Sequence, residues 1–184
     1  RFIEVPITMP DNVAIELISQ VIKINPVVKD QWDQISDALS SSVNEPLKKV
    51  AEQTKVDELF LRKILPIHPI AALALKHISE VFASNQRSMF NFIKMDDSDN
   101  LQAFQWFIQT YGEDDANPLL SIDLLWNFFY EKGTDIHGQG SGRDNLDISV
   151  RRILDNYSKY SEQLYDKQKR VLKAVLIMQA IGSR

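Results

Sequence analysis

Residues 65–94, LPIHPIAALALKHISEVFASNQRSMFNFIK, contain the segment that decides the expected fold. Pro69 suits the first position of a helix, because proline lacks the backbone N–H that would be unpaired there. Apolar residues then continue almost without interruption to Phe82, so the helix predicted over 69–82 is apolar nearly all round. A helix of this kind needs burial on every side. We therefore expect it at the centre of a helical bundle.

Helical periodicity continues on both sides of this segment. Apolar residues spaced by three and four predict an amphipathic helix that ends at the serine triplet 40–42; they are Val28, Trp32, Ile35 and Leu39. Further helices are predicted over 89–94, 101–111, 119–132, 144–158 and 161–181. The last of these aligns apolar residues on an expected core face, namely Leu164, Val171, Leu172, Val175 and Met178. The sequence thus predicts an all-α bundle of about nine or ten helices with a short extended N-terminal segment.

Changes in composition divide the chain into four parts. Residues 1–10 are expected to be an extended entry from a preceding domain, and residues 11–132 form the helical bundle. Residues 133–143 (GTDIHGQGSGR) are expected to be a mobile linker loop, because they are rich in glycine and polar residues. Two long helices in 144–184 then pack on the bundle. The chain starts with Arg1, not Met, and both ends indicate a piece cut from a larger protein.

Composition excludes several kinds of chemistry. The chain has no cysteine, which excludes disulfides, thiol catalysis and Cys-ligated metals and favours a reducing, cytoplasmic location. The three histidines do not share a helical face, so no metal site is expected. No apolar run reaches the ~20 residues that a membrane helix needs. Glycines at 138, 140 and 142 lack the Lys-Ser or Lys-Thr and the preceding strand of a P-loop. We expect no catalytic residues, so the segment alone is not predicted to be an enzyme.

The polar residues 85–88 (NQRS) interrupt the apolar helix before the aromatic residues Phe90 and Phe92. Polar groups in an apolar context are costly unless they find partners. Such conflicts between local sequence and context often mark functional residues.

Residues 65–94 also resemble a segment of large bacterial P-loop ATPases of the AAA+ or STAND-like kind, many of them phage-defence or uncharacterised proteins. There, Pro-x-His-Pro, an apolar helix and Asn-(Glu/Gln)-Arg-(Ser/Thr)-x-Phe-x-Phe follow the nucleotide-binding core. The matching residues are Pro66, His68, Pro69, Asn85, Gln86, Arg87, Ser88, Phe90 and Phe92. Glutamate is the more common residue where this chain has Gln86. Residues 170–175 (RVLKAV) are similar to a helix near the end of the same region.

The resemblance implies a non-catalytic helical lid or regulatory domain of a larger ATPase. Such a lid would couple the nucleotide state of a core missing from this segment to a partner, with ATP and Mg as cofactors of the parent protein and none here. Arg87 would sense the nucleotide, since a guanidinium pairs bidentately with phosphate, and His68 and Asn85 would assist. The structural alternatives are an ion pair of Arg87 with the acidic loop 96–99 and helix caps by His68 and Asn85.

Two other functions stay open. A DNA-binding or other nucleic-acid-binding module would use the basic residues near the end of the chain, which are Arg151, Arg152, Lys167, Lys169, Arg170 and Lys173. The net charge of −4 does not favour it, because proteins that grip a phosphate backbone usually carry a basic excess. The last possibility is a protein-interaction or oligomerisation module that binds other protein subunits.

Overall fold

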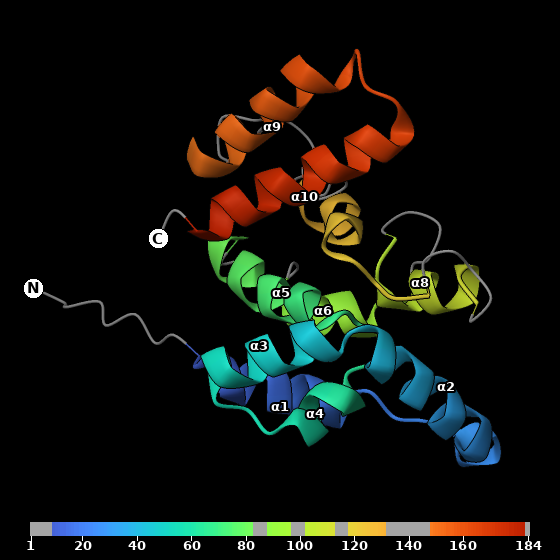
Figure 1. The fold of residues 1–184 in the computed structure, drawn as a ribbon. Helices are drawn as coiled ribbons and strands as arrows, with labels where there is room; N and C mark the ends of the chain where they lie inside the picture. The colour runs from blue at the N-terminus through green and yellow to red at the C-terminus, as the bar shows by residue number, and fades with distance from the viewer. Residues whose placement is uncertain (1–8, 83–87, 97–101, 113–117, 132–147, 183–184) are drawn as a thin grey trace, which may run out of the picture.

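Helix α5 (Pro69–Phe82) is the central element, as its apolar sequence predicts. The computed structural model describes residues 9–82, 88–96, 102–112, 118–131 and 148–182. Ala71, Leu75 and Ile78 of α5 are fully buried. The helix contacts α1, α3, α6, α10 and η3, and it lies in the middle of the molecule in Figure 1. The predicted bounds of this helix are confirmed.

Helices from the first third of the chain pack on one side of α5. They are α1 (Asp11–Val21), the 3₁₀ helix η1 (Pro26–Val28), α2 (Lys29–Ser42), α3 (Asn44–Thr54) and α4 (Glu58–Lys63). Helices α1 and α3 contact both α4 and α5, whereas α2 contacts chiefly its chain neighbours η1 and α3. The N-terminal end of α2 therefore extends away from the bundle (Figure 1).

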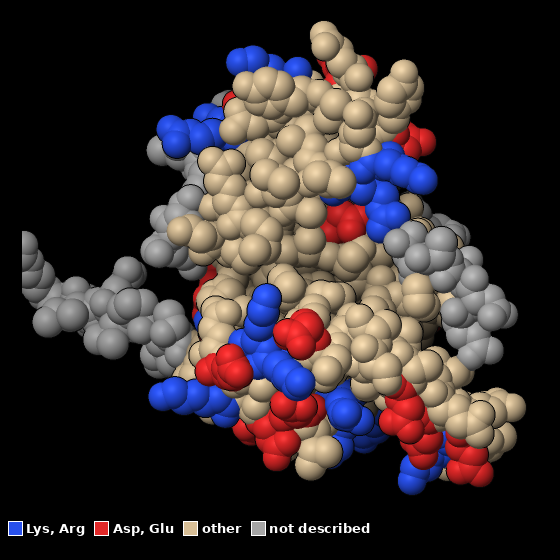
Figure 2. Space-filling model, in the orientation of Figure 1, with Lys and Arg blue, Asp and Glu red and all other residues tan. Residues whose placement is uncertain are grey.

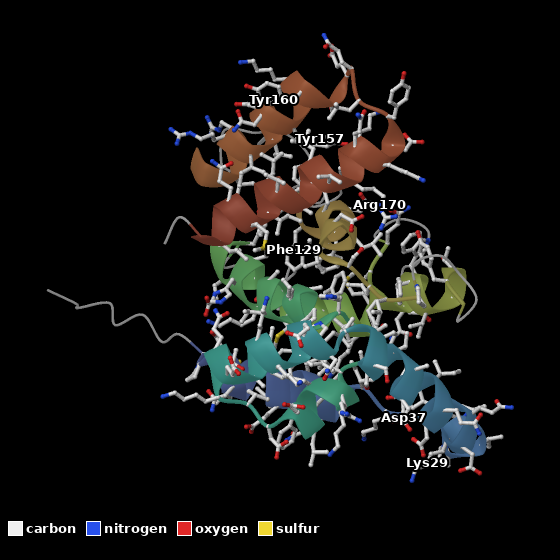
Figure 3. All side chains as sticks on the ribbon, viewed as in Figure 1. Lys29, Asp37, Phe129, Tyr157, Tyr160 and Arg170 are labelled. Carbon is white, nitrogen blue, oxygen red and sulfur yellow. The ribbon has the colours of Figure 1, made fainter. Side chains whose placement is uncertain are left out.

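Helices from the last part of the chain pack on the other side. Helix α10 (Asp166–Gly182) contacts α5 and η3 (Ile122–Leu124), and α9 (Ile148–Ser161) covers α10. Beside α5 lie α6 (Met89–Lys94), α8 (Phe104–Thr110) and the π-helix η4 (Asn127–Glu131). Aromatic rings fill the space between these layers, and Figure 3 shows Phe129 between α5 and α10. The ring centroids of Phe82 and Phe129 are 5.6 Å apart.

The described residues contain no β-strand, which confirms the all-α prediction for this part of the chain. The closest approach to a sheet is one isolated parallel bridge between Ile67 and Leu120. The N–H of His68 donates to the carbonyl of Leu120 at 3.0 Å, and the N–H of Leu120 donates to the carbonyl of Pro66 at 2.9 Å. None of the described helices is both long and apolar enough to cross a membrane. The extended entry predicted over 1–10 and the linker loop predicted over 133–143 lie largely or wholly outside the described residues.

Helix α2 ends at Ser42, the last residue of the serine triplet, as predicted, but the three serines form its last turn. The hydroxyls of Ser40 and Ser41 donate to the carbonyls of Ser36 and Asp37, each four residues earlier, at 2.7 and 2.9 Å. The hydroxyls thus find acceptors inside the helix instead of competing with it, and α2 continues to Ser42.

The helix predicted over 119–132 is correct only in part, because helical turns run from Ile122 to Glu131 but are not a regular α-helix. The bridge holds Leu120 in an extended conformation, so the helical turns start only at η3. A π-helix follows and buries three consecutive aromatic residues, Phe128, Phe129 and Tyr130. The prediction assumed a regular α-helix with 3.6 residues per turn, in which three successive side chains point to different faces. Such a helix would not bury all three aromatic residues against one neighbour.

The bounds of the last two helices differ from the prediction as well. Helix α9 is described over Ile148–Ser161 and ends three residues later than predicted, whereas its predicted start at 144 lies outside the described residues. Helix α10 starts at Asp166 instead of 161. The side chain of Gln168 accepts a hydrogen bond from the N–H of Tyr165 at 3.0 Å, which fixes the start of α10. The buried residues of α10 are Leu176 and Ile177, whereas Val171, Val175 and Met178 are exposed. The predicted core face is therefore wrong for these three residues, whereas Leu172 is partly buried against the core.

Candidate binding groove

An open apolar hollow lies between the α1–α2 connection and α8. Its volume is about 540 Å³, and its lining residues come from α1, η1, α2, α6, α8 and the segment before α5. Leu65 and Ile93 form a buried part of the wall, whereas Val28 and Ile108 are 42% and 46% exposed. Apolar walls with a few polar groups are typical of a binding site.

A second hollow of about 150 Å³ continues the first one. The two share Trp32, Pro66 and Ile108, and the second extends to Leu39 and Tyr111. We call the two together the α2–α8 groove. It follows α2 from Val28 to Leu39, a distance of about 16 Å at 1.5 Å per residue.

The groove is lined by the amphipathic stripe that the sequence predicts for α2 and the residue before it. Leu39 belongs to the core, and Trp32 and Ile35 are partly buried and pack against it. Periodicity therefore identified this face correctly, but it did not show that part of the face lines a groove. The groove residues on α6, α8 and the α1–α2 connection were missed, because no local pattern marks residues that come together only in the folded chain.

The wider end of the groove carries positive charge. Lys23 and Lys94 line it, and no carboxylate is among the residues that line this hollow. Both lysines are exposed, and neither forms an ion pair with another described residue. Two polar side chains at the same end already have partners, since Gln105 donates to the carbonyl of Ile93 at 3.0 Å and Asn25 accepts from the N–H of Val27 at 3.1 Å. The lysines are thus the groups left to meet an anionic ligand.

The residues of the predicted nucleotide sensor are only partly described. Arg87 and Asn85 lie outside the described residues. The Nδ1 atom of His68 accepts a hydrogen bond from the N–H of Ile70 at 3.2 Å, which is a helix-cap contact at the start of α5. Burial lowers the pKa of His68, which favours the neutral ring that this contact requires. The start of α6 is capped by Ser88, whose hydroxyl accepts from the N–H of Asn91 at 3.2 Å.

Two of the six predicted nucleic-acid-binding residues form internal contacts. The Nε atom of Arg170 lies 2.6 Å from an Asp123 carboxylate oxygen, and this hydrogen bond raises the pKa of Arg170. Lys173 lies 3.0 Å from Glu131, with its ammonium 5.9 and 5.5 Å from the ring centroids of Trp126 and Tyr157.

Figure 3 shows Arg170 and Tyr157 on the two sides of α10 that face these contacts. Both cations therefore fasten α10 to η3, η4 and α9. The remaining four are Arg151 and Arg152 on α9 and Lys167 and Lys169 in the first turn of α10. Arg170 and Lys173 thus also have a structural role, and the nucleic-acid-binding role of the six residues stays a prediction.

A partly buried charge cluster joins α1 to α5. The ammonium of Lys76 lies 2.9 Å from Asp11 and 3.1 Å from Glu80. Burial by itself lowers the pKa of Lys76, but the hydrogen bonds to the two carboxylates outweigh burial and raise it. His77 lies 3.5 Å from Asp11. The cluster holds helices together, and no set of three possible metal ligands occurs among the described residues.

Comparison with protein-family models, with curated proteins and with solved structures finds no match for this chain.

Proposed function

We propose that this chain is a non-catalytic helical module that binds an amphipathic, acidic helix of a partner protein in the α2–α8 groove. The observation that carries the proposal is the uncovered apolar stripe of α2. Trp32 and Ile35 of this stripe are only partly buried against the core and also line a hollow, and Ile108 of α8 lines the same hollow with 46% of its surface exposed.

Leaving this surface in water has a cost. Burial of apolar surface stabilises by roughly 25 cal/mol per Å², and contiguous apolar patches on a protein surface commonly mark interaction sites. Val27, beside the stripe, is 89% exposed. Burial of these side chains under a partner would therefore stabilise the complex.

The partner segment is best matched by a helix. Binding of an extended peptide as an added strand requires a free sheet edge, and the described residues contain none. A groove lined along about 16 Å instead accommodates two to three turns of helix, whose anchors at i, i+3, i+4 and i+7 would contact the walls. Acidic residues near one end of that helix would meet Lys23 and Lys94.

The other two functions have less support. The lid role rests on Arg87 and Asn85, outside the described residues, and it stays a prediction to be tested by Arg87→Ala in the longer parent protein. Binding of a nucleic acid would require cations directed to solvent, whereas Arg170 and Lys173 are engaged with carboxylates.

The test uses two designed helical peptides of about 14 residues, which form roughly four turns. Both carry leucines at i, i+3, i+4 and i+7; one has two glutamates near its end and the other has lysines there. We expect the acidic peptide to bind and Ile108→Glu to weaken it at least about tenfold, which corresponds to 1.4 kcal/mol. Fluorescence anisotropy of labelled peptide measures the affinity.

Matched variants separate the two parts of the proposal. Leu59→Glu adds the same charge at an exposed apolar residue of α4 outside the groove, and should leave binding unchanged. The double change Lys23→Glu with Lys94→Glu should exchange the preference, so that the lysine peptide binds better. If neither peptide binds, or if Leu59→Glu weakens binding as much as Ile108→Glu, the groove is not the binding site. Binding without exchange would refute the role of the two lysines.

A further inference from the structure

Helix α10 carries a second uncovered apolar surface, on the face opposite its buried residues. Val171, Val175 and Met178 are 64%, 56% and 47% exposed. Their spacings of four and three residues place them on one face of the helix. Leu176 and Ile177 are buried on the other side. The helix is therefore apolar on two faces, whereas the bundle covers only one of them.

Charge is distributed unevenly along this helix. All its cations lie in the first half, at Lys167, Lys169, Arg170 and Lys173, and residues 174–182 contain no charged residue. Figure 2 shows the same asymmetry, with blue side chains near the N-terminal end of α10 and an uncharged surface toward its C-terminal end. Arg170 and Lys173 are engaged with Asp123 and Glu131, so Lys167, one turn before Val171, is the cation on the side of the apolar stripe. A parallel neighbour of the same sequence would place Lys167 against Lys167, whereas an antiparallel neighbour places Lys167 against the uncharged half of the other helix.

The apolar stripe is also nearly symmetric about its own centre. Val171 and Met178 lie at equal distances from the midpoint between Ala174 and Val175. In an antiparallel pair centred there, Val171 of one copy meets Met178 of the other, and Ala174 meets Val175. Lys167 then lies near the last turn of the other helix, where the carbonyl end of the helix dipole attracts a cation.

We propose that a second copy of this chain packs antiparallel on α10, around a two-fold axis that passes between Ala174 and Val175. Such an interface uses the same patch on both copies, which is the commonest arrangement in homodimers. Tyr165, 81% exposed just before α10, would lie near the C-terminal end of the partner's α10. One helix face is smaller than the ~800 Å² per partner of a standard interface. The dimer should therefore dissociate on dilution.

Single cysteines test the arrangement directly, because the chain has none of its own. Disulfides form only when the two Cα atoms are within about 7 Å. Val175→Cys lies beside the proposed axis and should crosslink to itself under mild oxidation. Val171→Cys should not crosslink to itself, because residues seven positions apart are separated by about 10 Å along a helix. A mixture of Val171→Cys and Met178→Cys chains, distinguished by a tag, should give the mixed product.

The control is Leu59→Cys, an equally exposed position on α4. Crosslinking of Val175→Cys no faster than Leu59→Cys would overturn the proposal of a second copy. Self-crosslinking of both Val171→Cys and Met178→Cys, without a preference for the mixed product, would indicate a parallel pair and overturn the antiparallel one. Sedimentation gives an independent measurement. The mass should rise with concentration for the unchanged chain but stay that of a monomer for Val175→Arg. Because Val175 lies on an exposed face, Val175→Arg should leave the circular dichroism spectrum unaltered.

Discussion

Removal of the Tyr130 hydroxyl should stabilise this protein. Tyr130 is fully buried in the π-helix η4, and its hydroxyl has no hydrogen-bond partner among the described residues. Burial raises the pKa of Tyr130 to about 12. The ring itself is well packed, with its centroid 4.7 Å from that of Trp126 and 5.2 Å from that of Phe82. Tyr130→Phe therefore removes only the group that lacks a partner.

The expected magnitude follows from the cost of an unpaired buried polar group, which is about 1–3 kcal/mol. Because Phe keeps the ring contacts, Tyr130→Phe should raise the free energy of unfolding by at least about 1 kcal/mol. For a domain of this size, that corresponds to a rise of roughly 2–4 °C in the melting temperature. Urea denaturation followed by circular dichroism measures the change.

Tyr165→Phe is the matched control, because its hydroxyl belongs to an 81% exposed side chain. This variant should change stability by less than about 0.5 kcal/mol. A loss of stability in Tyr130→Phe would refute the reasoning, since it would mean that the hydroxyl is satisfied by a group such as a buried water. An unchanged stability would show that the unpaired hydroxyl carries no cost.

Three further predictions concern single contacts. The free energy of unfolding should decrease as the pH falls below the ordinary histidine pKa of 6.5. Burial lowers the pKa of His68, so the unfolded chain binds the proton more readily than the folded one. Urea titrations at about pH 7.5 and 5.5 should show a smaller decrease for His68→Asn, which keeps a cap acceptor. Asp123→Ala should lower the free energy of unfolding by about 1 kcal/mol, because it removes the partner of the partly exposed Arg170. Thermal melts compare this variant with Lys167→Ala, which should leave the melting temperature unchanged. Lys76→Met should lower the free energy of unfolding by about 2 kcal/mol, because it leaves the carboxylates of Asp11 and Glu80 without their shared cation. Urea denaturation measures the change, and a variant more stable than the unchanged chain would contradict the prediction.

The two uncovered stripes give the molecule two different surfaces. The α2–α8 groove is concave and carries lysines at one end, whereas the α10 face is a single convex helix with an uncharged half. A concave surface favours insertion of a partner helix, and a convex one favours side-by-side packing. The peptide and crosslinking experiments address them separately, because neither set of substitutions touches the other surface.

Elements with local signals are predicted correctly from the residues alone. Both α5 and α6 have the predicted bounds, since Pro69 fixes the start of the first and Ser88 caps the second within three residues. The continuous apolar sequence of α5 required burial on all sides, and this determined its central place. Absence of strands in the described residues also agrees with the helical spacing of apolar residues along the chain.

Which apolar faces are covered depends on contacts between distant parts of the chain. Trp32 and Ile35 on α2 and Val175 on α10 have the same spacing as core residues, yet the first two are only partly buried at a groove and the third is exposed. Periodicity reports that a helix has an apolar face, but a contact needs a second element, and its position depends on chain segments far away. The same reason explains the difference over 119–132. There the N–H of Leu120 donates to Pro66 and its carbonyl accepts from His68, both more than fifty residues earlier, and these hydrogen bonds replace the first turn of the expected helix.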